Sequence, residues 1–343
     1  MQVSANPQER ELVDTASAGL PSGWRRWRRR ESGPAQFLLE LALQYSVIIA
    51  LVVLMVVAQI LYPGFLSVTN IWNILSQNAE LALVALGVSY CLIAGVFDLS
   101  VGSIVGLGSL VAAQEAAHGV AVAFLAAIVA GLAAGLINAF VVTKLNVNAF
   151  IATLGTQTVF LGIATIFSTT TIFATNPAFL DIGTEKALGI PAIVVIVGVV
   201  FAIAAFVLHK TVYGRILFIL GGNAEAARLA GLRVKAARGS VFVVSGLCAA
   251  VAGLLLATVV GNGQATYGAE YTLDAYAMVV VGGTSLFGGE GAIWRTVAGV
   301  LIIAMTQNLF ESLALPGSAQ DLVIGGVLIL AVALDAFARG RRT

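Results

Sequence analysis

The chain has 343 residues, of which 59% are hydrophobic and only 10% are charged, and its formal net charge is +1. A soluble domain carries about 25% charged residues because its surface faces water, so this composition all but excludes a soluble enzyme. The mean hydropathy of +0.98 instead favours a polytopic membrane protein.

The N-terminal segment is polar and ends in a basic cluster, Trp24–Arg30 (WRRWRRR). We expect residues 1–38 to form a basic cytoplasmic tail, with tryptophan at the level of the lipid head groups. A polybasic segment of this kind also attracts anionic lipid. The apolar segment that follows is longer than the hydrophobic part of a signal peptide, so we expect it to be retained.

Apolar runs suited to membrane-spanning helices recur along the chain, and a span needs about 20 residues. They predict an all-α integral membrane fold with about ten transmembrane helices, which form a polytopic domain at 39–338. The predicted spans are 42–62, 79–97, 100–117, 120–142, 150–172, 191–209, 240–261, 272–287, 292–313 and 320–338. Gly131 and Gly135 in the fourth span predict a close contact with another helix.

The positions of Lys and Arg predict how these spans are oriented. With the N-terminus inside, every one of the 18 basic residues except Lys186 falls on the cytoplasmic side. Cytoplasmic loops of membrane proteins carry such an excess of positive charge. We therefore expect an even number of spans, both termini in the cytoplasm and a short cytoplasmic tail at 339–343.

Patterns typical of catalysis, metal binding or nucleotide binding do not occur in the sequence. Cys91 and Cys248 lie in apolar runs and are interpreted as core residues. GxxxxGK[ST] is absent, so any ATP must be bound by another subunit. No predicted span has an acid at its middle, which argues against a proton relay. We expect no catalytic residue, no metal site and no nucleic-acid partner.

The longest cytoplasmic loop, 210–239, contains a short predicted helix. Asn223 is suited to cap its N-terminus, and Gly231 is suited to the position after its C-terminus. Glu225 lies at the positive end of the helix dipole, and Arg228 is its i+3 neighbour. A helix placed between two spans either docks on a partner or packs on its own domain.

Four stretches carry a resemblance to a known family. They are Phe97–Ser103 (FDLSVGS), Phe150–Thr156 (FIATLGT), Gly214–Gly231 and Glu270–Leu286. In this order and spacing they resemble the permease subunits of bacterial ABC importers for ribose and related sugars, a group that includes autoinducer-2 importers. The resemblance covers residues 40–338. The sequence departs from the family pattern at Phe97, Ala230, Glu290, Ala292 and Arg295.

The resemblance implies a transport subunit of the bacterial inner membrane that has no ATPase site and moves a monosaccharide or related polyol. The implied partners are an ATPase that binds ATP and Mg, a periplasmic or lipid-anchored sugar-binding protein, a second permease copy or paralogue, and the lipid membrane. It also implies that the 222–231 helix couples to the ATPase. The residues expected to do so are Gly222, Asn223, Glu225, Ala226, Ala227, Arg228 and Gly231.

Two further sets of roles are expected within this family. Asp98 is expected to order an inner turn by capping the amides from Ser100 to Gly102. Neutral polar side chains suit a polyhydroxy solute, and packing between helices is the alternative explanation for each. The residues expected to line the solute path are Gln77, Thr153, Gln157 and Thr284.

Three other functions stay open at this point. A branched-chain amino-acid permease shares a similar GGN loop, although the FDLSVGS and GGTSL stretches favour sugars. The scarcity of mid-span acids argues against a stand-alone secondary carrier. A membrane-embedded enzyme would need a nucleophile with a base or a metal cluster, and the sequence contains neither pattern. Segments 83–113 and 275–305 resemble one another, which suggests an internal repeat.

Overall fold

The computed structural model describes residues 45–187, 189–320, 322–326 and 329. Nearly all of them belong to the second of two units, Val47–Thr343. The predicted tails at 1–38 and 339–343 and most of the tenth predicted span lie outside the described residues.

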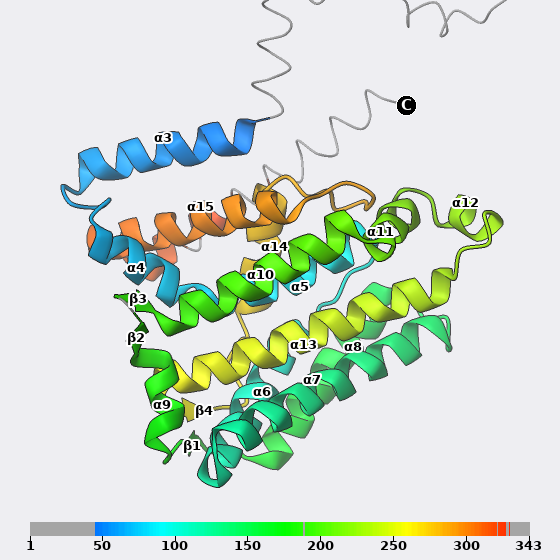
Figure 1. Cartoon of the computed structure of the whole chain (residues 1–343), viewed down its shortest axis with the longest axis horizontal. Helices are drawn as coiled ribbons and strands as arrows, with labels where there is room; N and C mark the ends of the chain where they lie inside the picture. The colour runs from blue at the N-terminus through cyan, green and yellow to red at the C-terminus, as the bar shows by residue number, and fades with distance from the viewer. Residues whose placement is uncertain (1–44, 188, 321, 327–328, 330–343) are drawn as a thin grey trace, which may run out of the picture. The chain divides into compact units, whose positions relative to one another are not determined.

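The described residues form helices joined by short connections (Figure 1). The first helices are α3 (Ser46–Leu61), α4 (Val68–Gln77), α5 (Ala79–Ile93), α6 (Val101–Glu115), the 3-10 turn η2 (Ala116–His118), α7 (Val120–Thr143) and α8 (Ala149–Phe167). The later ones are α9 (Pro177–Thr184), α10 (Ala192–Lys210), α11 (Val212–Gly222), α12 (Ala224–Leu229), α13 (Val234–Val260), α14 (Tyr271–Val281) and α15 (Ile293–Ser312). Two antiparallel pairs of two-residue strands join β1 (Ile172–Phe173) to β4 (Asn262–Gly263), and β2 (Lys186–Ala187) to β3 (Ile190–Pro191).

Five of these helices are long and apolar enough to cross a membrane, namely α7, α8, α10, α13 and α15. The bent pair α4 and α5 makes a sixth candidate if it is one span. The helical, multi-pass character expected from composition is thereby confirmed. The total of ten spans and the location of the termini stay predictions, because several apolar helices are shorter than a full span.

Helix α13 forms the centre of the core and packs against α5, α6 and α7. Its apolar segment is 61% buried, against 28% for α7 and α8 and 17% for α10. A Cβ added to Gly131 of α7 would lie 2.5 Å from the carbonyl oxygen of Gly246 in α13, so the close contact predicted at Gly131 and Gly135 is present. The uncovered apolar faces of α7, α8 and α10 suit lipid or another membrane helix.

The predicted span 79–97 is only the second half of a bent pair. Helices α4 and α5 meet at 54°, and Asn78 at the bend donates from Nδ2 to the carbonyl of Ile74 at 3.1 Å. Glu80, in the first turn of α5, is buried beside this bend. The sequence did not indicate α4 because its polar Asn, Ser and Gln residues interrupt the apolar run.

The connection between α5 and α6 is also longer than predicted, because it comprises residues 94–100 and not just two residues. Gly95 has a φ of +74°, and its N–H and that of Val96 donate back to carbonyls of the last turn of α5. From the sequence, the apolar side chain of Val96 predicts that this residue belongs to a helix. In the structure the side chain is apolar because the connection is buried in protein. Irregular backbone is tolerated at membrane depth only where protein or water surrounds it.

Helix α12 and the strand pairs lie at opposite ends of α13 (Figure 1). Among the described basic residues, Lys186 belongs to the strand end, in β2. The others belong to segments at the α12 end: Lys144, Lys210, Arg215, Arg228, Arg233, Lys235, Arg238 and Arg295. This separation of charge gives the two ends of the fold different electrostatic character.

Candidate functional site

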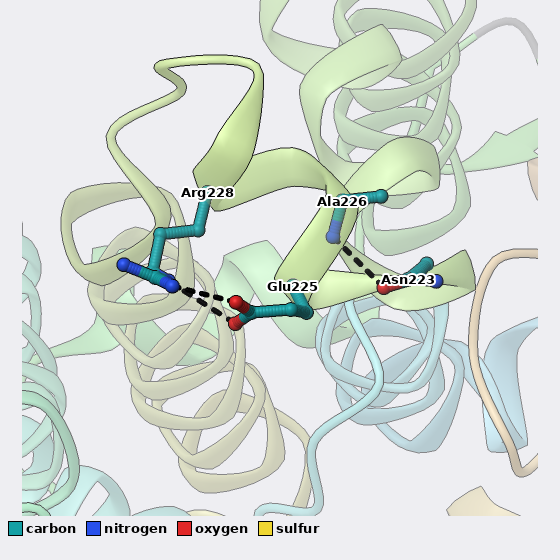
Figure 2. A network of polar contacts seen from close by, with 4 residues as sticks. All are labelled: Asn223, Glu225, Ala226 and Arg228. Atoms are coloured by element: carbon teal, nitrogen blue, oxygen red, sulfur yellow. Dashed lines mark hydrogen bonds and ion pairs between the residues drawn. The ribbon is translucent and has the colours of Figure 1, made fainter.

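Helix α12 is short, but both of its ends are closed by hydrogen bonds. Oδ1 of Asn223 accepts from the N–H of Ala226 at 2.9 Å, as its position predicts (Figure 2). At the other end the N–H of Gly231 donates to the carbonyl of Arg228 at 3.0 Å, and that of Leu232 donates to Ala227 at 3.1 Å. With φ of +78° at Gly231, this is a Schellman motif. The helix is therefore formed without a partner.

The outer face of α12 carries an ion pair. Arg228 donates to Glu225 from Nη2 at 2.6 Å and from Nε at 3.1 Å (Figure 2). The Arg228 guanidinium lowers the pKa of Glu225, so the pair is ionised at neutral pH and is lost only as pH falls through that lowered pKa. Both side chains are about two-thirds exposed, at 66% and 65%, and Leu229 is 75% exposed. Ala227, on the inner face, is buried.

The base of α12 is in backbone contact with two other turns through five glycines. This glycine junction comprises Gly95, Gly221, Gly222, Gly288 and Gly289. The N–H of Gly289 donates to the carbonyl of Ile93, the last residue of α5, at 2.9 Å. A Cβ on Gly221 would overlap that same carbonyl oxygen. The junction therefore holds the end of α5, the start of α12 and the loop before α15 together at backbone distance.

Asp98 lies in a buried polar network that joins several helices. Its Oδ1 accepts from the N–H of Ser100 at 3.1 Å and from the Ser100 hydroxyl at 2.7 Å. Asn138 of α7 donates to Oγ of Ser100 at 2.7 Å, and Thr156 of α8 donates to Oδ1 of Asn138 at 2.6 Å. Tyr276 of α14 accepts from the N–H of Asp98 at 2.9 Å. The network thus connects the 94–100 segment with α7, α8 and α14.

The predicted capping role of Asp98 is correct for Ser100 but wrong for Gly102. The N–H of Gly102 donates to Oγ1 of Thr272 at 3.2 Å. Thr272 reaches it because Gly102 packs against the backbone of Gly268, just before α14. A side chain on this face of α6 would prevent that approach.

Comparison with known proteins relates almost the whole fold to one family. Residues 70–332 match the family described as "Branched-chain amino acid transport system / permease component". The chain belongs to this permease family. With its several candidate spans, it is a multi-pass permease of the bacterial inner membrane.

Curated relatives of the permease are named for sugars. The ribose import permease protein of Haemophilus influenzae is 38% identical over 294 residues, covering 84% of this chain and 91% of the relative. That of Bacillus subtilis is 38% identical over 292 residues, with the same coverage. The L-arabinose transport system permease protein of Escherichia coli K12 is 34% identical over 303 residues, covering 86% of this chain and 90% of the relative. No solved structure matches the chain.

The four residues predicted to line the solute path lie on three elements of the permease. Gln77 is exposed at the end of α4, and Gln157 is half-buried on α8. Thr153, also on α8, is fully buried and donates to the carbonyl of Ala149 at 2.8 Å. Thr284, in the loop after α14, is buried with no hydrogen-bond partner for its hydroxyl. Thr153 and Gln157 are one helical turn apart on α8.

Sequence reasoning missed the polar residues with the most constrained surroundings. Asn138 and Tyr276 bind the Asp98 segment from 40 and 178 residues away, and no local pattern predicts such partners. Glu80 is buried with one carboxylate oxygen unpaired, and Tyr271 hydrogen-bonds to it. The available signal for Glu80 was its position as an acid next to a helix break, because broken helices bind ligands in transporters.

Two further features bear on what the permease binds. An apolar cavity of about 170 Å³ lies between the α4–α5 bend, α10 and α15, and its lining includes Ala82, Phe201 and Leu301. Across the described residues, no three His, Cys, Asp or Glu side chains gather closely enough to hold a metal ion. The polar groups that remain for a solute are hydroxyls, amides and isolated carboxylates.

Proposed function

We propose that this permease is the transmembrane subunit of an ABC importer that moves a monosaccharide or a related polyol across the inner membrane. The observation that carries the proposal is helix α12, which is preformed, exposed and placed at the basic end of the fold. Relatives along nearly the whole chain are named as ribose and L-arabinose permeases, which supports a monosaccharide as the solute.

In this proposal α12 docks on a separate ATPase subunit, and that subunit binds ATP and Mg. Its exposed surface is made by Glu225, Arg228 and Leu229, while Ala227 anchors it to the permease. The internal ion pair leaves the outer lone pairs and N–H groups of Glu225 and Arg228 available to a partner. The helix and its two ends are formed by Gly222, Asn223, Ala226 and Gly231.

Movement of α12 is expected to reach the membrane region through the glycine junction. The junction has no side chains to deform, so a displacement of Gly221 acts directly on the end of α5 and on the loop before α15. ATP binds the closed ATPase pair more tightly than the open one, and this differential affinity shifts the permease between its two states. The permease itself needs no catalytic residue for this cycle.

The proposal also includes partners outside the ATPase. A periplasmic or lipid-anchored sugar-binding protein delivers the solute, so the permease site itself does not need high affinity. A second copy or a paralogue completes the pathway, and the uncovered faces of α7, α8 and α10 offer apolar surface for it or for lipid. A branched-chain amino acid is the second candidate solute, because the family description names that class.

Purification from mild detergent tests the proposal directly. We expect the tagged chain to bring with it a protein with a nucleotide-binding motif, whose ATP hydrolysis rises when the sugar-loaded binding protein is added. Ribose, L-arabinose and leucine, each loaded on the binding protein, distinguish the two solute classes. Purification without an ATPase, together with solute movement along an ion gradient in vesicles, would support a secondary carrier and contradict the proposal.

A further inference from the structure

A cleft lined by basic side chains lies beside α12 and shares only Arg228 with the docking face described above. Its volume is about 590 Å³, and no acidic residue lines it. Its cations come from the end of α7, from α12 and from the start of α13: Lys144, Arg228, Arg233, Lys235 and Arg238. We call this feature the basic cleft.

Most of the positive charge in the basic cleft is not neutralised within the described part of the chain. Arg228 is the cleft residue that forms an ion pair there, with Glu225. Lys235 donates from Nζ to Oδ1 of Asn146, a neutral acceptor, at 3.0 Å. Nε of Arg238 is buried without a hydrogen-bond partner. A buried donor without an acceptor is costly, so an acceptor that reached Arg238 would stabilise this part of the chain.

The first turn of α13 adds to the positive potential of the cleft. Helix α13 has 27 residues, and no side chain caps its N-terminus, where Val234, Lys235 and Ala236 line the basic cleft. The N–H of Val234 donates to the carbonyl of Leu232 at 2.9 Å, which leaves the N–H groups of Lys235 and Ala236 for a ligand. The N-terminus of a long helix also carries partial positive charge, which favours phosphate. The cations and the helix end therefore favour the same kind of ligand.

The position of the cleft along its helices indicates where that ligand comes from. Helices α7 and α13 are both candidate membrane spans. The cleft is lined by Thr143, the last residue of α7, and by Val234, the first residue of α13. The cleft therefore lies at the level where apolar spans give way to polar chain, which is the level of lipid head groups. Phe140 and Leu145, 56% and 58% exposed on either side of Lys144, offer apolar surface to acyl chains.

We propose that the basic cleft binds the phosphate head group of an anionic phospholipid of the cytoplasmic leaflet. The phosphate oxygens accept hydrogen bonds from Arg238 and from the first turn of α13, while Lys144 and Arg233 supply charge. A bound head group connects the end of α7 to the start of α13 next to α12, so anionic lipid stiffens the support of the docking helix. An ATPase surface is the competing occupant, but the exposed apolar side chains of Phe140 and Leu145 beside Lys144 suit acyl chains better than a water-soluble subunit.

Lipid titration of the purified full chain tests the proposal. The delipidated chain in detergent is titrated with short-chain phosphatidylglycerol, phosphatidylcholine or inorganic phosphate, and binding is followed by native mass spectrometry. We expect saturable binding of phosphatidylglycerol only. Each cation near a membrane surface contributes about fivefold to anionic-lipid affinity, so Lys144→Gln with Arg238→Gln should weaken binding about 25-fold.

Matched variants separate the cleft from general basicity and from misfolding. Lys210→Gln with Arg215→Gln removes two cations from the same end of the fold but from outside the cleft, and should leave phosphatidylglycerol binding unchanged. Arg233 and Lys235 are exposed, so replacing both with Gln does not disturb packing and should weaken binding to a similar extent.

Three results would overturn the lipid assignment. Equal phosphatidylglycerol binding by the cleft variants and the matched controls would show that the cleft is not the site. Competition by inorganic phosphate at the same concentration as phosphatidylglycerol would identify a free-anion site. Release of the lipid when the ATPase binds, with ATPase affinity lost in the Arg233→Gln/Lys235→Gln variant, would assign the cleft to the ATPase.

Discussion

Asp98 is a buried acid with no cationic partner among the described residues, so its surroundings must stabilise it by hydrogen bonds. Ser100 supplies two of them, and Asn138 holds the Ser100 hydroxyl in place by donating to it at 2.7 Å. Burying a charge or a strong acceptor without such bonds costs several kcal/mol. The Asn138 amide therefore helps to hold the 94–100 segment from α7, as Tyr276 does from α14.

Replacing Asn138 tests this dependence. Asn138→Leu removes the donor to Ser100 and the acceptor of Thr156, and leaves both hydroxyls with fewer partners in a buried site. We expect a loss of about 1–3 kcal/mol in unfolding free energy, measured by denaturation in detergent. Thr158→Ala, on the exposed face of α8, is the matched control and should change stability by less than about 0.5 kcal/mol. Equal stability of the two variants would contradict the network.

Gly231 is a second residue whose role is conformational. A Cβ at this position would contact nothing within 4 Å, so Gly231→Ala acts only through the positive φ. The strain of about 1 kcal/mol predicts amide exchange in 224–230 about fivefold faster and a weaker hold on the ATPase. Gly222→Ala is the control, because its Cβ also meets open space but its φ is not positive. If both variants lose affinity for the ATPase equally, the two glycines are needed for contact with the ATPase surface and not for closing the end of the helix.

Helix α12 is too short to be stable by propagation alone, because isolated helices below about 12 residues are marginal in water. What holds it is the cap at Asn223, the turn at Gly231 and the buried contact of Ala227. The cap and the turn are local signals, so the sequence predicts this element and its ends well. Its attachment is not local, because the glycine junction brings together residues separated by nearly 200 positions.

Substitution at the junction tests whether docking is mechanically connected to transport. The methyl group of Gly221→Ala would overlap the Ile93 carbonyl and displace the base of α12 from α5. We expect ATP hydrolysis to continue while transport per ATP falls at least tenfold in reconstituted vesicles. Gly155→Ala, whose Cβ meets open space on α8, should leave both rates unchanged. Normal transport by Gly221→Ala would show that force travels by another route.

The limits of sequence-based prediction are clearest in the 94–100 segment between α5 and α6. Hydropathy alone places helices at 79–97 and 100–117, because Val96 and Phe97 are as apolar as any lipid-facing residue. In the fold this segment is irregular and its apolar side chains face protein, so hydropathy cannot distinguish the two cases. The same limit hides Asn138 and Tyr276, whose partners are set by helix packing and not by spacing.

At the scale of the molecule, the basic residues of the described part of the chain are distributed unequally between the two ends of α13. The α12 end carries every described Lys and Arg except Lys186, and this is the asymmetry that orients a membrane protein. The α5–α6 and α14–α15 pairs both consist of two helices joined by an irregular segment that contains an acid, Asp98 or Glu290. The two pairs share the pattern of the internal repeat that the sequence suggests, and the repeat itself stays a prediction.

Cysteine labelling in intact cells tests the orientation. The starting chain has Cys91→Ala and Cys248→Ala, so that a membrane-impermeant maleimide has no native thiol to attack. We expect Lys186→Cys to react from outside, whereas Lys210→Cys should react only after permeabilisation, because both positions are exposed but lie at opposite ends of α10.

The C-terminus completes the labelling experiment, because it distinguishes an even from an odd number of spans. Thr343→Cys lies in the predicted tail, outside the described residues, and should behave like Lys210→Cys if both termini are cytoplasmic. Labelling of Thr343→Cys from outside would show that the chain has one span fewer than predicted, and the orientation of α10 would be unchanged. Labelling of Lys210→Cys from outside would show that the orientation is the reverse of the predicted one. Helix α12 would then lie away from any cytoplasmic ATPase, which would contradict the importer proposal as a whole.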